Sequence, residues 1–312
     1  MRAVVVRNPG GPEALEIVRV PEPVPGPGQV RVRVRAAAVN PVDAAVREGK
    51  LAEVGLMARH SVVGIGADIA GEVDEVGPGV GGLEAGQAVV ALRERFDGPY
   101  GAYADYVVLD ASAVAPAPAG MSPTVAATLP LNALTAQQAL ARLSLQPGRT
   151  LLVTGAAGAV GGYATELASL AGVHVVAVAG QQDEELIRSL GARSFIARTD
   201  DVARAARALV PGGVDAVLDA AVQGIQVLDA VRNQGAFASV LAGAAPFAMR
   251  GIRVTELQWV EADGRTLDGL ATLAGAGRLT PRVADVLPLT EAVEAHRRLA
   301  KGGLRGRLVL VP

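Results

Sequence analysis

Residues 150–180 read TLLVTGAAGAVGGYATELASLAGVHVVAVAG. A short apolar, β-branched run leads into Gly155, Gly158 and Gly161, and a second apolar run begins at Val173. Between the glycines and that run, apolar residues recur at steps of three and four, which is the period of a helix with one buried face. The stretch therefore predicts a βαβ unit: a strand, a glycine turn, a helix and a second strand covered on both faces.

The three glycines suit a bound pyrophosphate. Gly155 would form the tight turn, Gly158 would let the backbone approach the phosphates, and Gly161 would let the helix pack closely on its strand. The free N–H groups and the positive dipole end of the following helix attract anionic groups. Gly makes up 38 of the 312 residues, so the spacing alone is a weak signal, and a βα turn without a ligand stays open. The flanking strands and helix favour a dinucleotide site.

Composition limits the class of protein. A chain of 312 residues with 50% hydrophobic and 19% charged residues is long enough for two domains with large cores. A net charge of −2 provides no basic surface for nucleic acid or for a membrane, so we expect neither as a partner. Cys is absent, which excludes disulfides, thiolate metal ligands and a Cys nucleophile. No stretch of about 18 uninterrupted apolar residues occurs, and we expect a cytoplasmic protein.

The N-terminal part of the chain has a different pattern. Residues 30–37, VRVRVRAA, alternate apolar and charged side chains, which predicts a half-exposed strand of an antiparallel sheet. Residues 40–49 read NPVDAAVREG, in which Asp43 suits the cap of a short helix that ends at Gly49.

From NPVDAAVREG onwards, the motifs and their order resemble those of the zinc-free quinone oxidoreductase branch of the medium-chain dehydrogenase/reductase superfamily, which includes zeta-crystallin. NPVDAAVREG is similar to the NPxDxxxRxG segment of that family. Six further matches follow in the family's order: GIGADIAGEVDEVGPG from residue 64, GAYADYV from 101, PLNALTAQQAL from 130, GAAGAVG from 155, LGA from 190 and GRLVLV from 306. Ala159 replaces one family glycine, and Arg307 replaces the usual Lys. The resemblance covers the whole chain.

The resemblance implies an α/β protein with two domains. Residues 1–118 would form a GroES-like, mostly antiparallel β catalytic domain, and residues 119–252 a Rossmann domain with a doubly wound parallel sheet. Residues 253–312 would return to complete the catalytic domain. The apolar runs at residues 214–218 and 236–241, separated by a helical stretch, independently continue the βα alternation. The family also tends to form homodimers through its Rossmann sheets.

The resemblance further implies hydride transfer from NADPH to a small-molecule quinone, enone or enal, without a metal. A catalytic zinc needs about three Cys, His or acidic ligands. Asn40 stands where zinc-dependent relatives have their first Cys, and Ala67-Asp68 stands where they have a His-Glu pair, while the three histidines are scattered. The catalytic residue that we expect is Asn40, whose side-chain amide would donate to the substrate oxygen. A turn-forming Asn before Pro is the other interpretation.

The end of the second strand bears on the choice of cofactor. Residues 178–180 supply no acid for the ribose of NAD, which opposes a strong preference for NAD. The family's Ser and Lys phosphate contacts are replaced here by Gly180 and Asp183, which opposes NADP. Arg198, however, falls where the family has a Tyr or His beside the adenosine ribose, and a guanidinium there suits a phosphate. A solvent-facing Arg198 stays open, and we expect NADPH with NADH possible. By resemblance, the expected cofactor-binding residues are Asn40, Thr135, Gly155, Ala157, Gly158, Ala159, Val160, Gly161, Gly180, Arg198 and Leu241.

Two other functions stay open. An enoyl-thioester reductase would need positive charge near its substrate site for a phosphopantetheine carrier, and the sequence shows no clear cluster of this kind. The family often has a Tyr two residues after the Asp of its NPxD segment, and Ala45 stands there instead. This loss is compatible with a nucleotide-binding redox sensor or a structural protein with little turnover.

Overall fold

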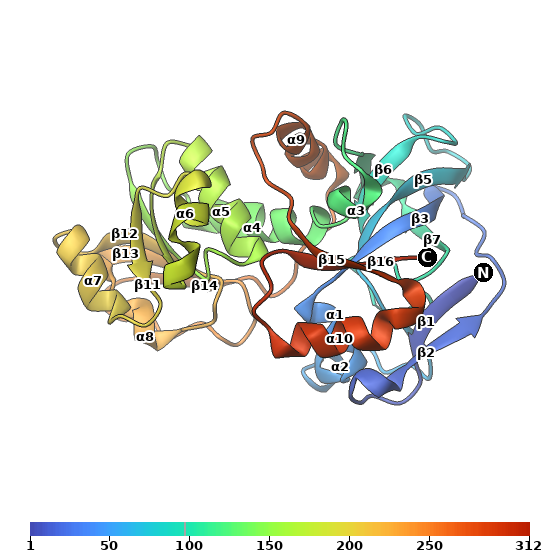
Figure 1. The fold of residues 1–312 in the computed structure, drawn as a ribbon, viewed down its shortest axis with the longest axis horizontal. Helices are drawn as coiled ribbons and strands as arrows, with labels where there is room; N and C mark the ends of the chain where they lie inside the picture. The colour runs from blue at the N-terminus through green and yellow to red at the C-terminus, as the bar shows by residue number, and fades with distance from the viewer. Residues whose placement is uncertain (97) are drawn as a thin grey trace. The chain divides into compact units, whose positions relative to one another are not determined.

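The computed structural model describes residues 1–96 and 98–312, which fall into two compact units. The first unit comprises Met1–Leu131, Glu261–Gly277 and Pro281–Pro312, and the second comprises Asn132–Val260 and Arg278–Thr280. Figure 1 shows that both ends of the chain lie in the first unit, next to strands β1 and β16. No helix in the described ranges has the length and apolar character needed to cross a membrane.

Strand β3 (Gln29–Val39) is the centre of the largest sheet of the first unit. It pairs antiparallel with β5, β7 and β16. The sheet runs in the order β15-β16-β3-β5-β6-β8, with β7 paired to β3 beside that path. The other strands are β5 (Asp68–Val76), β6 (Ala88–Leu92), β7 (Tyr106–Asp110), β8 (Val114–Pro116), β15 (Val283–Pro288) and β16 (Arg307–Val311). The predicted alternation is confirmed, because the valines of β3 are buried and the arginines between them reach solvent.

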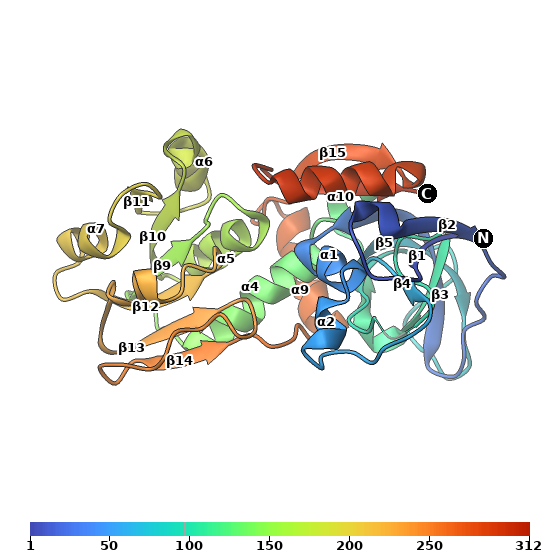
Figure 2. The ribbon, with the colours of Figure 1, turned by 90° about the horizontal axis from the view of Figure 1, so that it is seen from below.

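A small sheet and several helices complete the first unit. The small sheet runs β2-β1-β4 and contains β1 (Arg2–Val6), β2 (Leu15–Arg19) and β4 (Val63–Gly64). The helices are α1 (Pro41–Arg47), α2 (Lys50–Glu53), α3 (Pro123–Ala126), α9 (Gly264–Gly275) and α10 (Ala292–Lys301). Figure 2 shows α10 lying along β15, so the last part of the chain covers one edge of this unit. The predicted short helix is present as α1, but the predicted cap is wrong: the helix begins at Pro41 with Asn40 as its N-cap, and Asp43 lies in its first turn.

The second unit contains one six-stranded sheet in which every pair of neighbouring strands is parallel. Its strands, in spatial order, are β11 (Ser194–Ala197), β10 (His174–Ala179), β9 (Thr150–Thr154), β12 (Val214–Asp219), β13 (Val231–Ser239) and β14 (Arg253–Glu256). The helices are α4 (Pro130–Leu143), whose first two residues belong to the first unit, α5 (Ala159–Leu170), α6 (Glu184–Ser189), α7 (Val202–Leu209) and α8 (Ile225–Leu228). Residues 278–280 join this unit through Thr280, whose backbone N–H donates to Glu166 on α5 over 3.1 Å.

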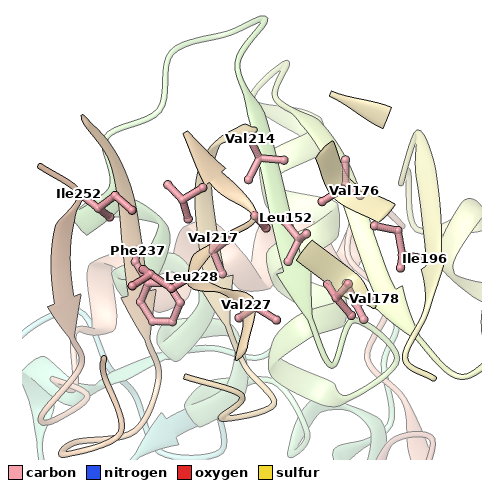
Figure 3. Close-up of a cluster of buried hydrophobic side chains, with 14 residues drawn as sticks. Leu152, Val176, Val178, Ile196, Val214, Val217, Val227, Leu228, Phe237 and Ile252 are labelled. Carbon is pink, nitrogen blue, oxygen red and sulfur yellow. The ribbon is translucent and has the colours of Figure 1, made fainter. Parts of the chain in front are cut away.

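One face of this sheet carries a continuous apolar core, shown in Figure 3. Leu152, Val217 and Phe237 come from neighbouring strands, while Val227 and Leu228 come from α8. Each is at most 2% exposed. Full burial of a side chain of this size stabilises a protein by roughly 1.5–3 kcal/mol. The core therefore provides a rigid support for the loops at the carboxyl ends of the strands.

The order of the strands creates a switch point in the second unit. The chain proceeds outward from β9 through β10 and β11 on one side, and from β12 through β13 and β14 on the other. The carboxyl ends of β9 and β12 therefore lie next to each other where the order reverses. Ligands of open parallel sheets bind outside the carboxyl ends of the strands at such a point. The doubly wound parallel sheet expected from the sequence is confirmed.

Candidate functional site

The glycine turn occupies this switch point. Gly155 follows β9 with a φ of +60°, a conformation that side chains with a Cβ rarely adopt. A Cβ added to Gly161 would lie 2.3 Å from the Gly155 carbonyl oxygen, so α5 approaches the turn as closely as glycine allows. Gly158 is the N-cap of α5. The tight turn thus depends on glycine at position 155, and the close packing of α5 depends on glycine at position 161.

The geometry of this turn fits a pyrophosphate. The first intrahelical bond of the helix runs from Gly162 N to Gly158 O over 2.9 Å, so the N–H groups of Ala159, Val160 and Gly161 precede the helical bonding pattern. A Cβ at Gly158 would meet only the Gly155 carbonyl oxygen, at 3.1 Å. This backbone cradle, at the positive end of a twelve-residue helix, fits the phosphates of a dinucleotide.

The expected adenosine end of the site lies at β10 and β11. Gly180 directly follows β10, and the Arg198 backbone N–H donates to the Ala179 carbonyl oxygen over 2.7 Å. The structure thus brings Gly180 and the exposed Arg198 to the same edge of the sheet. Asp183 is buried near Gly180, and Glu184 pairs with Arg188 on α6 at 2.8 Å.

The remaining cofactor candidates occupy three places. Ala157 lies in the glycine turn and is 8% exposed, whereas Leu241 follows β13 and is 52% exposed. Thr135 is buried within α4. Asn40 belongs to the first unit. The carboxyl edge of the second unit's sheet therefore gathers most of the expected residues.

Two buried residues to which the sequence motifs gave no role, Thr154 and Asp219, connect β9 and β12. The Thr154 hydroxyl donates to Asp219 Oδ1 over 2.6 Å and accepts from Ala221 N over 3.0 Å. Asp219 also accepts from Gln223 N over 3.1 Å and from Gly224 N over 2.7 Å. Thr154 and Asp219 are fully buried. The available signal was a polar residue at the end of each of two apolar runs, because parallel strands bring such ends together.

In the first unit, Asn40 is the N-cap of α1 and is fully buried. Its backbone N–H donates to Asp43 Oδ2 over 2.8 Å, as a capping residue of this type does. Its side-chain Nδ2 donates to Asp68 Oδ2 over 2.7 Å. The turn-forming role is therefore present, and the amide that we expected to face a substrate oxygen is oriented by a neighbouring carboxyl group.

Asp43 and Asp68 are both fully buried around Asn40. The Tyr103 hydroxyl donates to Asp43 Oδ2 over 3.0 Å, and Leu131 N donates to Asp68 Oδ1 over 2.6 Å. Burial raises the pKa of each carboxyl group to about 7, although these donors oppose the rise. Within the described chain, Asp43 Oδ1 has no hydrogen-bond partner. Asp68 and Tyr103 both lie in family-like motifs of the sequence, which gave neither of them a role.

His296 packs against this network. Its ring lies 5.9 Å from the Tyr103 ring at an interplanar angle of 84°, and its Nδ1 accepts from Arg47 over 2.9 Å. Burial and the Arg47 guanidinium lower the pKa of His296 to about 4. The imidazole is therefore neutral at pH 7 and fixes α10 to α1. Over residues 1–96 and 98–312, no three His, Asp or Glu side chains come together in a way that could hold a metal ion.

Comparison with known proteins identifies the family. The alcohol dehydrogenase GroES-like domain matches residues 26–119, and a zinc-binding dehydrogenase domain matches residues 190–310. A chloroplast envelope quinone oxidoreductase homolog from Arabidopsis thaliana is 30% identical over 97% of this chain and 95% of its own length. The chain belongs to the medium-chain dehydrogenase/reductase superfamily. It falls in the quinone oxidoreductase-like branch, so the family and the GroES-like and Rossmann folds expected from the sequence are confirmed.

Relatives in this superfamily are named for different activities. A chloroplastic NADPH-dependent alkenal/one oxidoreductase from Arabidopsis thaliana is 29% identical over 100% of this chain and 80% of its own length. The crystal structure of an NAD-dependent alcohol dehydrogenase matches with a TM-score of 0.87 at 33% identity and covers 100% of both chains. The protein is therefore an oxidoreductase of this superfamily, and its second unit fits a nicotinamide cofactor.

Proposed function

We propose that this protein transfers a hydride from NADPH to a quinone or to an α,β-unsaturated ketone or aldehyde, and that it does so without zinc. The observation that carries the proposal is the backbone cradle at Gly155, Gly158 and Gly161, placed at the switch point between β9 and β12. NADPH supplies the hydride when bound, and the protein holds and orients the reactants. The names of the quinone and alkenal/one oxidoreductase relatives support this substrate class.

The preference for NADPH rests on charge at the end of β10. Gly180 provides no carboxylate for a ribose 2′-hydroxyl, and the exposed Arg198 lies at the same edge of the sheet. A guanidinium recognises a phosphate through charge-assisted hydrogen bonds. Arg198 is therefore the proposed contact for the 2′-phosphate. The carboxylates at the start of α6 oppose it, and turnover with NADH is expected to persist at a lower rate.

The zinc-free chemistry rests on the residues around Asn40. Asn40, Ala67 and Asp68 offer no zinc ligand set, because the Asn40 amide nitrogen donates to Asp68 and Ala67 has no ligand atom. We propose that Asn40, held by Asp68, donates its second amide N–H to the substrate oxygen as negative charge develops there. This N–H contacts the Ala38 carbonyl oxygen over 3.4 Å and would have to turn from it to the substrate. No acid is assigned to the final protonation, which in this proposal uses a proton from solvent.

The test is cofactor oxidation, followed at the nicotinamide absorbance band, with a panel of quinones, enones and enals. Arg198→Ala should raise the KM for NADPH about tenfold or more, because a charged hydrogen bond contributes roughly 1.5–3 kcal/mol, and should leave the KM for NADH nearly unchanged. Arg193→Ala is the matched control. Arg193 is also exposed, but it precedes β11 and contacts His174, so neither KM should change.

Three outcomes would contradict the proposal. If Arg198→Ala raised the KM for NADPH and the KM for NADH equally, Arg198 would not be the contact for the 2′-phosphate. Saturable binding of NADPH without turnover of any acceptor would favour a redox sensor or a structural protein. Retention of activity after exhaustive chelation is expected, and loss that zinc restores would disprove the zinc-free chemistry.

A further inference from the structure

Val222, in the loop between β12 and α8, has an unusual backbone conformation. Val222 has a φ of +55°, and it follows Asp219 in the segment that leads to α8. A β-branched residue in the left-handed region is a steric outlier, because its Cβ approaches the neighbouring carbonyl oxygen. Glycine would adopt this conformation without that cost. Strain of this kind persists only where the surrounding structure enforces it.

Thr154 and Asp219 enforce the conformation. The residue before Val222 donates its backbone N–H to the Thr154 hydroxyl, and the two residues after it donate theirs to the Asp219 carboxylate. Both acceptors are fully buried. Val222 is therefore fixed on both sides by two buried side chains that face each other at the carboxyl ends of the paired strands β9 and β12.

The same loop lies directly against the glycine turn. A Cβ added to Gly155 would lie 3.1 Å from the Ala221 Cβ and 3.4 Å from the Ala221 nitrogen. Val222 is nevertheless 45% exposed, so the enforced conformation leaves an apolar side chain in solvent beside the turn. Gln223 Oε1 is buried and has no hydrogen-bond partner among the described residues. The loop thus keeps one exposed apolar group and one unsatisfied polar group.

The orientation of the proposed dinucleotide on the sheet indicates which half of it lies near Val222. Its pyrophosphate lies at the glycine turn after β9, and its adenosine half extends towards Gly180 and Arg198 at β10 and β11. The nicotinamide half must then extend to the other side of the switch point, where β12 and its loop lie. An apolar side chain at this place would pack against the ribose and the nicotinamide ring.

We infer that Val222 contacts the nicotinamide half of the bound dinucleotide, and that Asp219 and Thr154 hold it there at the cost of a strained backbone. This inference rests on the proposed cofactor site. Val222 would then have two opposing effects. Its strained backbone lowers the stability of the unliganded protein, and its contact with the dinucleotide strengthens binding.

The test measures urea unfolding without cofactor and the dissociation constant for NADPH by fluorescence titration. Val222→Gly should raise the urea midpoint and weaken NADPH binding roughly fivefold, because the strain and the side chain are both removed. Val222→Ala should weaken binding similarly with a smaller rise in the midpoint, because alanine keeps the Cβ and loses only the branch. Gln234→Gly is the control: Gln234 has a φ of +58° and is exposed, but it lies in the first half of β13. It should raise the midpoint and leave binding unchanged.

Unchanged NADPH binding in both Val222 variants would overturn the contact, and an unchanged midpoint in Val222→Gly would overturn the strain. If the unmodified protein bound neither NADPH nor NADH, the proposed function and this inference would both fail. If the unmodified protein bound NADPH and both Val222 variants bound it equally well, only this inference would fail and the proposed function would stand.

Discussion

The side-chain amide of Asn40 donates to Asp68 Oδ2 over 2.7 Å, so the residue proposed to bond the substrate oxygen is itself held by a buried carboxyl group. The same carboxyl group accepts from Leu131 N, where α4 begins. Asp68 is thus a positioning residue that connects the N-cap of α1 to the first turn of another helix.

Removing the Asp68 carboxyl group should destabilise the protein. Asp68→Ala leaves the Asn40 amide and the Leu131 N–H without this acceptor, and an unsatisfied buried donor costs about 1–3 kcal/mol. We expect a loss of roughly 3 kcal/mol in the free energy of unfolding, measured with urea. Glu72→Ala on the same strand is the control, because Glu72 pairs at the surface with Arg35 and its loss should change stability by less than about 1 kcal/mol. Equal effects of the two substitutions would contradict a special role for Asp68.

The buried carboxyl groups should make the protein less stable as the pH rises from about 4 to 7. Burial raises the pKa of Asp43 and of Asp68 from 3.8 to about 7, so in this range the folded protein binds protons that the unfolded chain has released. The stabilisation is complete below pH 3.8 and is lost as the pH rises through 7. His296 acts in the opposite sense between pH 4 and 6.5, because its pKa is lowered on folding.

Asp43→Asn isolates one of these contributions. The variant cannot release a proton at this position, so the unmodified protein should lose stability relative to it by at most about 1.4 kcal/mol per pH unit. Urea unfolding of the cofactor-free protein from pH 4.5 to 8 measures this difference. Parallel curves for the two proteins would show that the pKa of Asp43 is not raised.

Gly161 should not tolerate alanine. The new Cβ would lie 2.3 Å from the Gly155 carbonyl oxygen and 2.8 Å from the Ala156 Cα, so the turn or the helix must shift. We expect a loss of roughly 2–3 kcal/mol in unfolding free energy and weaker cofactor binding. Gly269→Ala in α9 is the matched control. No atom lies within 4 Å of a Cβ built there, and alanine in a helix interior should add about 0.5–1 kcal/mol.

Thr154→Val should loosen the loop after β12. Valine keeps the shape of threonine but leaves the Ala221 N–H without its acceptor, which costs roughly 1–3 kcal/mol, and removes one donor to Asp219. Thr165→Val is the control within α5. The Thr165 hydroxyl donates over 2.8 Å to the Gly161 carbonyl oxygen, which sits within the helix, so its loss should cost no more than about 1 kcal/mol. Hydrogen exchange at Gln223 and Gly224 should accelerate only in the Thr154 variant.

The parts of the fold that the sequence predicted correctly depend on local spacing. Glycines three residues apart between two apolar runs define the turn at Gly155 and the start of α5, and the alternation of Val and Arg defines β3. These patterns involve residues that are close in sequence and therefore close in space. They can be recognised without knowing the tertiary structure.

The network around the candidate sites could not be predicted in the same way. Tyr103 and Asp43 are separated by 60 residues, Leu131 and Asp68 by 63, and Thr154 and Asp219 by 65. Such pairs form only after the strands have found their neighbours. The positive φ of Val222 was equally hidden, because the residue type opposes the conformation that the tertiary structure imposes.

The pairing of β16 with β3 determines how this protein can be recombined with its relatives. Leu308 and Leu310 face Val39 and Ala37 across that pair, so the sheet of the first unit is assembled from both ends of the chain. A fragment that stops after residue 131 would expose the edge of β3 to intermolecular pairing. Residues 132–260 form one uninterrupted piece of the second unit. A chimera that changes cofactor preference should therefore be made by replacing this internal piece, with both ends of the chain taken from one parent.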